Sequence, residues 1–492
     1  TPFIFAITDT PGGNRVPGPD TIAVEVARIT NRQPIVNLSC KSDDRNGLYQ
    51  RILGLYHQGL HNFFAVTGDY AATGRASFDL DSVNLLMVMN TLRRGLDYPS
   101  LLPRPGAALE GLRMGAAVSP FKYLEPDLWG QYLKLWKKRQ SGADFFITQL
   151  GYDVAKFQEL RLYMERAGLG AVPAIAGVYF LTPQFLKILN RVHVAGVVIP
   201  DDLKKKYRGQ LVPKAERSRL RKMSFVELAE YQKRMSIRRA ALLADIVVRG
   251  FGYKGVDLGG ITEFEDALEI MATIRELEAR DWRENLEEYR DGDGERPLQL
   301  APEDPFYLFP PGDDGLLADG PFQRGDYSTF QEPDLRMERL HHTFFEEDGW
   351  GHGLIKWAVG GAEEAAKTRL AVLAEQAIKR STLGCEMCGD CRIADLQYLC
   401  PEPSSGCAKR LLNGPCGGAD ENGFCEVVRD RRCYWAQVIE RALRAGEANG
   451  LTRIQPPKDP QLAHTSSWRN DLLGKCAAAL DLGHPQEAVP RL

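Results

Sequence analysis

Several common features are missing from this sequence of 492 residues, and each absence excludes a class of protein. No uninterrupted apolar run is long enough to span a bilayer, and no signal-peptide pattern is present. Neither charge sign dominates, because 62 Lys and Arg residues stand against 65 Asp and Glu residues, for a formal net charge of −3. A general nucleic-acid binder would carry a clear basic excess. We therefore expect a cytoplasmic protein that has no membrane span and does not bind nucleic acid.

Histidine is also scarce, with eight in the chain and none between Cys385 and Cys433. Cysteine is concentrated instead, since eight of the ten cysteines crowd into this one stretch. Disulfide scaffolds are usually small and secreted, so metal binding is the better interpretation in a chain of this length. The eight are Cys385, Cys388, Cys391, Cys400, Cys407, Cys416, Cys425 and Cys433.

Tetrahedral thiolate coordination takes four sulfurs per site, for zinc and for a cubane cluster alike. Eight cysteines therefore predict two sites, or one site with some cysteines left structural. The lack of histidine disfavours a mixed Cys/His zinc site. The opening Cys-x2-Cys-x2-Cys run favours [4Fe-4S] clusters, and Cys400-Pro401 offers a fourth ligand at a longer spacing than in ferredoxins. Zinc remains the alternative.

Residues 1 to about 275 alternate short apolar runs with amphipathic segments. The runs are continuously apolar, as strands buried on both faces of a parallel sheet are. Repeated βα units predict a TIM barrel or a doubly wound sheet, and eight candidate strands favour the barrel. The runs lie at residues 3–8, 34–40, 62–68, 114–119, 144–149, 174–180, 194–200 and 253–260.

Residues 280–335 are rich in Pro, Gly and Asp, which is typical of a linker or an extended segment. Its aromatic residues Phe306, Tyr307 and Phe309 indicate that it packs against a domain. We predict three parts: a barrel at 1–278, a linker or wrapping segment at 279–340, and a cysteine-rich domain at 341–492.

Polar side chains follow several predicted strands, including Asn37, Asp69 and Gln149. In a parallel βα barrel, functional side chains lie at this end of the strands. A carboxylate and a carboxamide there could bind a polar heterocycle. The alternative is that Asp69 caps a turn and Gln149 satisfies backbone groups.

Four segments of the predicted barrel resemble signatures of the methylenetetrahydrofolate reductase family, and they occur in the same order. The resemblance spans about residues 3–275. The segments are "IVNLSCKSDDRNGLYQRILGLYHQGLHNFFAVTGDY" (35–70), "SGADFFITQLGYDVAKFQEL" (141–160), "GVYFLTPQF" (177–185) and "GVVIP" (196–200).

The resemblance implies a TIM barrel that holds a flavin, FAD or FMN, and reduces 5,10-methylenetetrahydrofolate to 5-methyltetrahydrofolate. Asp69 and Gln149 are then the expected catalytic residues, and both contact substrate together with Phe185. Asn37 and Thr67 stand where well-known enteric-type enzymes have His and Arg, which leaves their flavin contacts open. The expected cofactor-binding residues are Thr8, Asn37, Thr67, Gly68, Asp69 and Lys138.

This sequence differs from the family pattern at the expected acid catalyst. The first strand of the family carries a glutamate that is the expected proton donor, but "FIFAITDTPGG" (3–13) resembles the second family strand. We expect the first strand and its glutamate to lie upstream of Thr1. One of the eight runs should then not be a barrel strand, and 194–200 is our choice. We expect Asp9 to stabilise the turn in which it lies, and not to replace the missing glutamate as proton donor.

The cysteine region resembles the cysteine-rich partner of methylenetetrahydrofolate reductase, over about residues 300–475. This partner is a separate small subunit in acetogenic bacteria and is fused behind the barrel elsewhere. It is associated with iron–sulfur clusters in anaerobes, and its domain has also been described as zinc-binding. The matching words are "CEMCGDCRIADLQYLCP" (385–401), "CAKRLLNGPCGG" (407–418), "GFCEV" (423–427) and "CYWAQVIERA" (433–442).

The leading hypothesis is a flavin-dependent methylenetetrahydrofolate reductase whose C-terminal clusters relay electrons. Its expected partners are a folate substrate, NAD(P)H or an electron-donor protein, and other subunits in an oligomer or larger redox complex. The chain has no G-x-G-x-x-G after a strand, but reductases of this family bind NADH on the flavin without one. The alternatives are a folate-binding methyltransferase or accessory protein with structural zinc, and a scaffold without catalysis.

Overall fold

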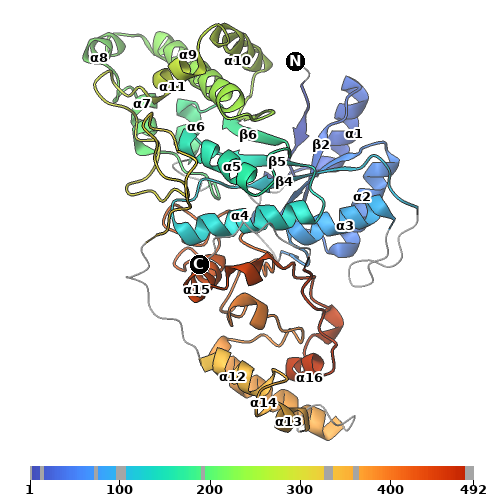
Figure 1. Ribbon diagram of the computed structural model, residues 1–492. Coiled ribbons are helices and arrows are strands. Elements are labelled where there is room, and N and C mark those ends of the chain that lie inside the picture. The colour runs from blue at the N-terminus through green and yellow to red at the C-terminus, as the bar shows by residue number, and fades with distance from the viewer. Residues whose placement is uncertain are drawn as a thin grey trace.

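The N-terminal part of the protein is built on a parallel sheet of seven strands, in a computed structural model that describes residues 3–11, 16–70, 76–95, 107–189, 194–325, 336–357 and 365–481. The spatial order of the strands follows the sequence, and every neighbouring pair is parallel (Figure 1). This confirms an α/β, TIM-like fold. The strands are β1 (Ala6–Ile7), β2 (Ile35–Ser39), β3 (Asn62–Val66), β4 (Arg113–Val118), β5 (Phe145–Leu150), β6 (Ala174–Tyr179) and β7 (Gly255–Gly259).

The two ends of this sheet approach each other. Phe3 lies just before β1, Phe264 begins helix α10 (Phe264–Leu277) beyond β7, and their ring centroids are 5.8 Å apart. The sheet therefore curls most of the way into a barrel, with seven strands rather than eight among the described residues. Run 194–200 is not a strand, which confirms the prediction. There the chain turns at Gly196, whose φ is +71°, and Pro200 precedes helix α7 (Asp201–Tyr207).

Helices connect the strands and cover the outer face of the sheet (Figure 1). Val36 and Leu38 of β2 are fully buried in the core, whereas Asn37 between them faces the opposite side. Alternation of this kind leaves polar strand residues on the inner face of the curled sheet. The helices are α1 (Pro19–Thr30), α2 (Arg45–His57), α3 (Ser82–Arg94), α4 (Glu125–Gln140), α5 (Val154–Arg166), α6 (Pro183–Leu189), α8 (Lys214–Leu220) and α9 (Phe225–Asp245).

The segment after helix α11 (Trp282–Arg290) is extended and packs against α5. Lys156 and Glu159 of α5 are completely buried and form an ion pair of 2.9 Å. Lys156 also donates to the backbone oxygen of Phe306 at 2.8 Å, and Glu159 accepts from the backbone N–H of Leu308. Because these bonds cross from the helix to the segment, the segment is part of the packed structure of the barrel.

Replacing Glu159 with Gln is expected to lower the free energy of unfolding by about 3 to 5 kcal/mol, because Lys156 then remains buried without its counter-ion. Urea unfolding followed by circular dichroism measures the loss. The control is Glu165→Gln on the same helix, where the glutamate pairs with Arg161 but its side chain is 62% exposed. That variant should lose no more than about 1 kcal/mol. Equal losses would contradict the role of the buried pair.

The C-terminal region lies against α4, and α15 (Tyr434–Ala445) packs along that helix (Figure 1). At this interface Asp81, which caps α3, accepts hydrogen bonds from the backbone N–H groups of Leu412 and Asn413. Long loops between α14 and α15 carry the eight clustered cysteines. The other helices here are α12 (Arg336–Phe344), α13 (His352–Ile355), α14 (Ala365–Leu383) and α16 (Ser467–Leu472).

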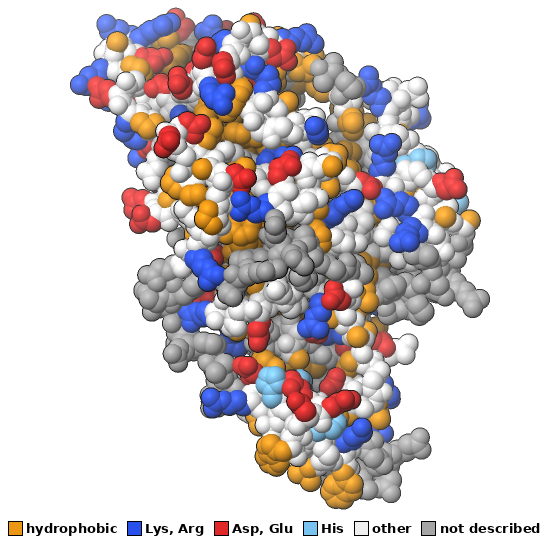
Figure 2. Space-filling model, viewed as in Figure 1, with side chains coloured by type: hydrophobic (Ala, Val, Ile, Leu, Met, Phe, Trp, Pro, Cys, Tyr) orange, Lys and Arg blue, Asp and Glu red, His pale blue; other side chains and the backbone are white. Residues whose placement is uncertain are grey.

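The surface carries Lys and Arg side chains interspersed with Asp and Glu (Figure 2), in keeping with the small net charge. Hydrophobic side chains gather at the lower tip in that view, near α12 and α13. Trp350 is 83% exposed there and Trp357 is 80% exposed. Among the described residues, no helix combines the length and the apolar character that crossing a membrane requires.

Candidate active site and metal centres

Polar side chains collect at one edge of the curled sheet. The structure places Thr8, Asn37, Asp69 and Gln149 at or just beyond the carboxyl ends of β1, β2, β3 and β5. The carboxyl ends of parallel neighbours meet at the same edge, which is where βα barrels bind substrates. Asp9 follows Thr8 and accepts from the backbone N–H of Ser39 at 3.0 Å, so it links the ends of β1 and β2.

The amide of Gln149 is engaged with the backbone. Its Nε2 donates to the oxygen of Ala195 at 3.2 Å, and its Oε1 accepts from the N–H of Leu150 at 2.9 Å. Nearby, the ring of Phe185 stacks on Tyr179, the last residue of β6, with centroids 4.2 Å apart. A substrate that binds Gln149 would have to replace its bond to Ala195.

The turn after β3 is tightly built. Gly68 has a φ of +87°, and a Cβ there would lie 2.9 Å from the Cβ of Ser39, so only glycine fits. Asp69 follows, partly buried, and its negative charge acts on Lys41 and Lys409. The Asp69 carboxylate therefore interacts electrostatically with two lysines.

Two of the predicted cofactor residues point toward helices. The Thr67 hydroxyl bonds the Ser82 hydroxyl at the start of α3, 3.3 Å away. Lys138 of α4 is buried and donates from Nζ to the backbone oxygen of Ala117 in β4. Burial lowers the pKa of Lys138 well below its ordinary value. Both side chains lie between the sheet and its covering helices.

Two further residues at the inner edge were not singled out from the sequence. Ser119, just after β4, is buried, and its Oγ has no hydrogen-bond partner among the described residues. Asp257 lies within β7, and burial raises its pKa. A signal for Asp257 was available, because a carboxylate inside an apolar run is unusual. The unpaired Ser119 hydroxyl and the Asp257 carboxyl are polar groups that suit a polar ligand in the curled sheet.

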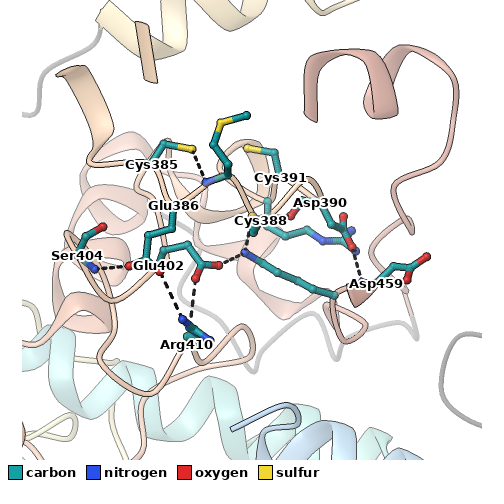
Figure 3. Close-up of polar contacts among 12 residues, drawn as sticks. Cys385, Glu386, Cys388, Asp390, Cys391, Glu402, Ser404, Arg410 and Asp459 are labelled. Carbon is teal, nitrogen blue, oxygen red and sulfur yellow. Dashed lines mark hydrogen bonds and ion pairs between the residues drawn. The ribbon is translucent and has the colours of Figure 1, made fainter. Parts of the chain in front are cut away.

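The eight clustered cysteines divide into two sets of four in sequence order. Each set lines its own cavity, and all eight are free thiols. The first quartet is Cys385, Cys388, Cys391 and Cys400, and the second quartet is Cys407, Cys416, Cys425 and Cys433. The first three cysteines lie close together in Figure 3. As the described side chains stand, no group of three or more is arranged around a single metal ion. The donor set of each cavity nonetheless fits a four-thiolate centre.

Two lysines flank the first quartet, Lys379 buried and Lys458 partly buried. Lys458 Nζ lies 3.1 Å from Cys388 Sγ and forms an ion pair with Glu402 (Figure 3 shows Cys388 and Glu402). Lys379 Nζ lies 3.9 Å from Cys391 Sγ. Burial raises the pKa of Cys388 to about 11, while Cys388 and Glu402 raise the pKa of Lys458 although burial opposes this. The ammonium groups of Lys379 and Lys458 would supply positive charge beside an anionic metal–thiolate centre.

The second quartet lies next to the barrel. Lys409 follows Cys407 by two residues, is 2% exposed, and donates from Nζ to the backbone oxygen of Gly68 at 2.7 Å. It also forms an ion pair with Glu426, which accepts from Cys416 Sγ at 3.3 Å. Burial raises the pKa of Cys416 to about 12. A continuous chain of polar contacts therefore joins this quartet to the turn before Asp69.

Comparisons with known proteins agree with this division of the chain. Residues 1–225 match the family described as methylenetetrahydrofolate reductase, and residues 365–461 match the one described as methylene-tetrahydrofolate reductase C terminal. No curated protein matches the chain. Among solved structures, a long-chain alkane monooxygenase is similar at 12% identity and a TM-score of 0.29, covering 55% of this chain and 74% of that one.

The two family matches coincide with the two regions that the structure shows. The first covers β1 to β6 with their strand-end residues, and the second covers both quartets. The chain therefore carries a methylenetetrahydrofolate reductase family domain, followed by the C-terminal domain found in methylenetetrahydrofolate reductases.

Proposed function

We propose that this protein is a flavin-dependent methylenetetrahydrofolate reductase that receives electrons through two iron–sulfur clusters in its C-terminal domain. The family domain supports reduction of methylenetetrahydrofolate. The observation that carries the relay is the position of the second quartet, whose Lys409 bonds the turn before Asp69. NAD(P)H or an electron-donor protein is the source of the electrons.

Some of the strand-end residues bind the substrate and others bind the flavin. Asp69 orients the pterin through charge-assisted hydrogen bonds and acts electrostatically on the flavin. Gln149 and Phe185 hold the substrate, the amide after exchanging its bond to Ala195. Thr8, Asn37 and Gly68 line the flavin. Thr67 and Lys138 support it indirectly, because they brace β3 and β4 from the helix side.

The quartets supply the thiolates for the clusters. Bound clusters would carry single electrons, which a flavin combines into a two-electron reduction. The Cys-x2-Cys-x2-Cys run in the first quartet and the separate four-cysteine cavities support two cubanes. The lysines beside both quartets would offset the negative charge of the thiolates.

An anaerobic visible spectrum and metal analysis of the purified protein test the proposal. We expect flavin bands, the broad absorbance of iron–sulfur clusters, and about eight iron atoms per chain, four for each cubane. The protein should also reduce methylenetetrahydrofolate. Zinc without iron would contradict the relay while leaving the reductase intact. Absence of flavin together with zinc would contradict the reductase and favour a folate-binding methyltransferase or accessory protein.

A further inference from the structure

The buried cation Lys409 lies between the second quartet and the turn after β3. The Lys409 ammonium donates to the backbone oxygen of Gly68 at 2.7 Å and pairs with Glu426 on its other side. It also lies 5.6 Å from the centre of the Phe78 ring, on which Tyr70 stacks with centroids 6.0 Å apart. Lys409 thus contacts the turn after β3 directly through Gly68 and indirectly through the ring that supports Tyr70.

The same cation is within electrostatic reach of groups on both sides. Asp69 acts on it from the barrel, and Cys416 and Glu426 act on it from the cysteine-rich domain. Charges interact much more strongly in a buried site than in water, because the effective dielectric constant is low. The Lys409 charge therefore interacts both with the second quartet and with Asp69.

We propose that Lys409 is a positioning residue that couples the second quartet to the Asp69 turn. It holds Gly68 and Asp69 in place for folate, and it links the charge of the metal centre at the second quartet to the reduction potential of the flavin. The second quartet is then the centre that exchanges electrons with the flavin, and the first quartet is the outer one. This inference rests on the proposed function.

The chain offers a matched control in Lys458. It is a partly buried lysine, with its side chain 20% exposed, and it too pairs with a glutamate beside a cysteine quartet. Within the described part of the chain, its ammonium group bonds Cys388 and Glu402 and no residue of the barrel. Replacing each lysine with Met removes one positive charge next to one quartet, and of these two charges only that of Lys409 contacts the Asp69 turn.

The test compares Lys409→Met with Lys458→Met in the full-length protein purified with flavin and metal. Anaerobic redox titration gives the flavin midpoint potential, and equilibrium binding gives the dissociation constant for 5-methyltetrahydrofolate. Lys409→Met should lower the flavin potential, because a nearby positive charge is lost, and weaken folate binding about tenfold. Lys458→Met should leave both values at those of the wild type. Equal effects of the two substitutions, or no effect of the first, would overturn the coupling.

A change of opposite sign separates electrostatics from simple disruption. Glu426→Gln leaves the Lys409 charge without its ion-pair partner and should raise the flavin potential, whereas Lys409→Arg should keep it. If Lys409→Met does not fold, these two variants decide the matter, and a fall of the potential in Glu426→Gln would overturn the inference. Wild-type protein without flavin or metal would instead overturn the proposed function. Wild-type protein that holds both, with an unresponsive flavin potential, would overturn the inference alone.

Discussion

Replacing Cys416 with Ser is expected to remove one metal centre and leave the other. Cys416 lines the second cavity with three other cysteines, whereas the first cavity has four cysteines of its own. A hydroxyl is a much poorer ligand than a thiolate for iron or zinc in such sites. Metal content per chain should therefore fall by about half, measured by elemental analysis and acid-labile sulfide. Flavin should no longer be reduced through the relay.

The reciprocal variant and a ninth cysteine complete this experiment. Cys388→Ser should also lose about half of the metal, this time from the first quartet, because each site uses four thiolates of its own. Cys476 lies outside both cavities, so Cys476→Ser should keep the full complement. Complete loss in either single variant would mean that the quartets form one site. Full retention in both would mean that the thiols do not ligate metal.

The strands could be predicted from the sequence because each of them leaves a short continuous apolar run. Strands buried on both faces are continuously apolar, and seven of the eight runs form the sheet. Run 194–200 has the same composition but contains Gly196 in a left-handed conformation and ends at Pro200, where α7 begins. Glycine and proline decide the conformation there, against the apolar pattern. Its exclusion came from the resemblance and not from the pattern.

The orientation of strand-end side chains was predictable only in part. Phe63, Ala65 and Thr67 are two residues apart and share a face, so the burial of the first two in the core already places the Thr67 hydroxyl toward α3. That period was available in the sequence. Lys138 is different, because its bond to Ala117 depends on how α4 packs onto β4.

The cysteine motifs predicted the candidate ligands but not the charged residues that lie beside them. Cys spacing predicted two sites, and the cavities show which thiols share one. Lys409 carries no local signal, since its partner Gly68 lies 341 residues earlier in the chain. Lys458 likewise reaches Cys388 across 70 residues. Contacts of this range follow from tertiary packing, and no short pattern in the sequence encodes them.

Asp69→Asn is expected to lower kcat/KM for methylenetetrahydrofolate by about 100- to 1,000-fold, or about 3 to 4 kcal/mol of transition-state stabilisation. The amide has the same shape but cannot offer a negative charge to the pterin. It also leaves Lys41 and Lys409 without the charge that acts on both of them. Steady-state kinetics with a saturating electron donor measure the loss, and urea unfolding of the same preparation reports the stability.

The control is Asp44→Asn, at a carboxylate that follows β2 near the same edge of the sheet. Asp44 caps α2 by accepting from the N–H of Gly47 at 2.8 Å, and asparagine caps helices equally well, so activity and stability should both stay unchanged. The two measurements on Asp69→Asn separate catalysis from capping. A large loss of kcat/KM at wild-type stability assigns the carboxylate to the reaction. A loss of stability with wild-type kcat/KM in the folded protein would show instead that Asp69 serves the turn after β3, and the assignment to folate would then be wrong.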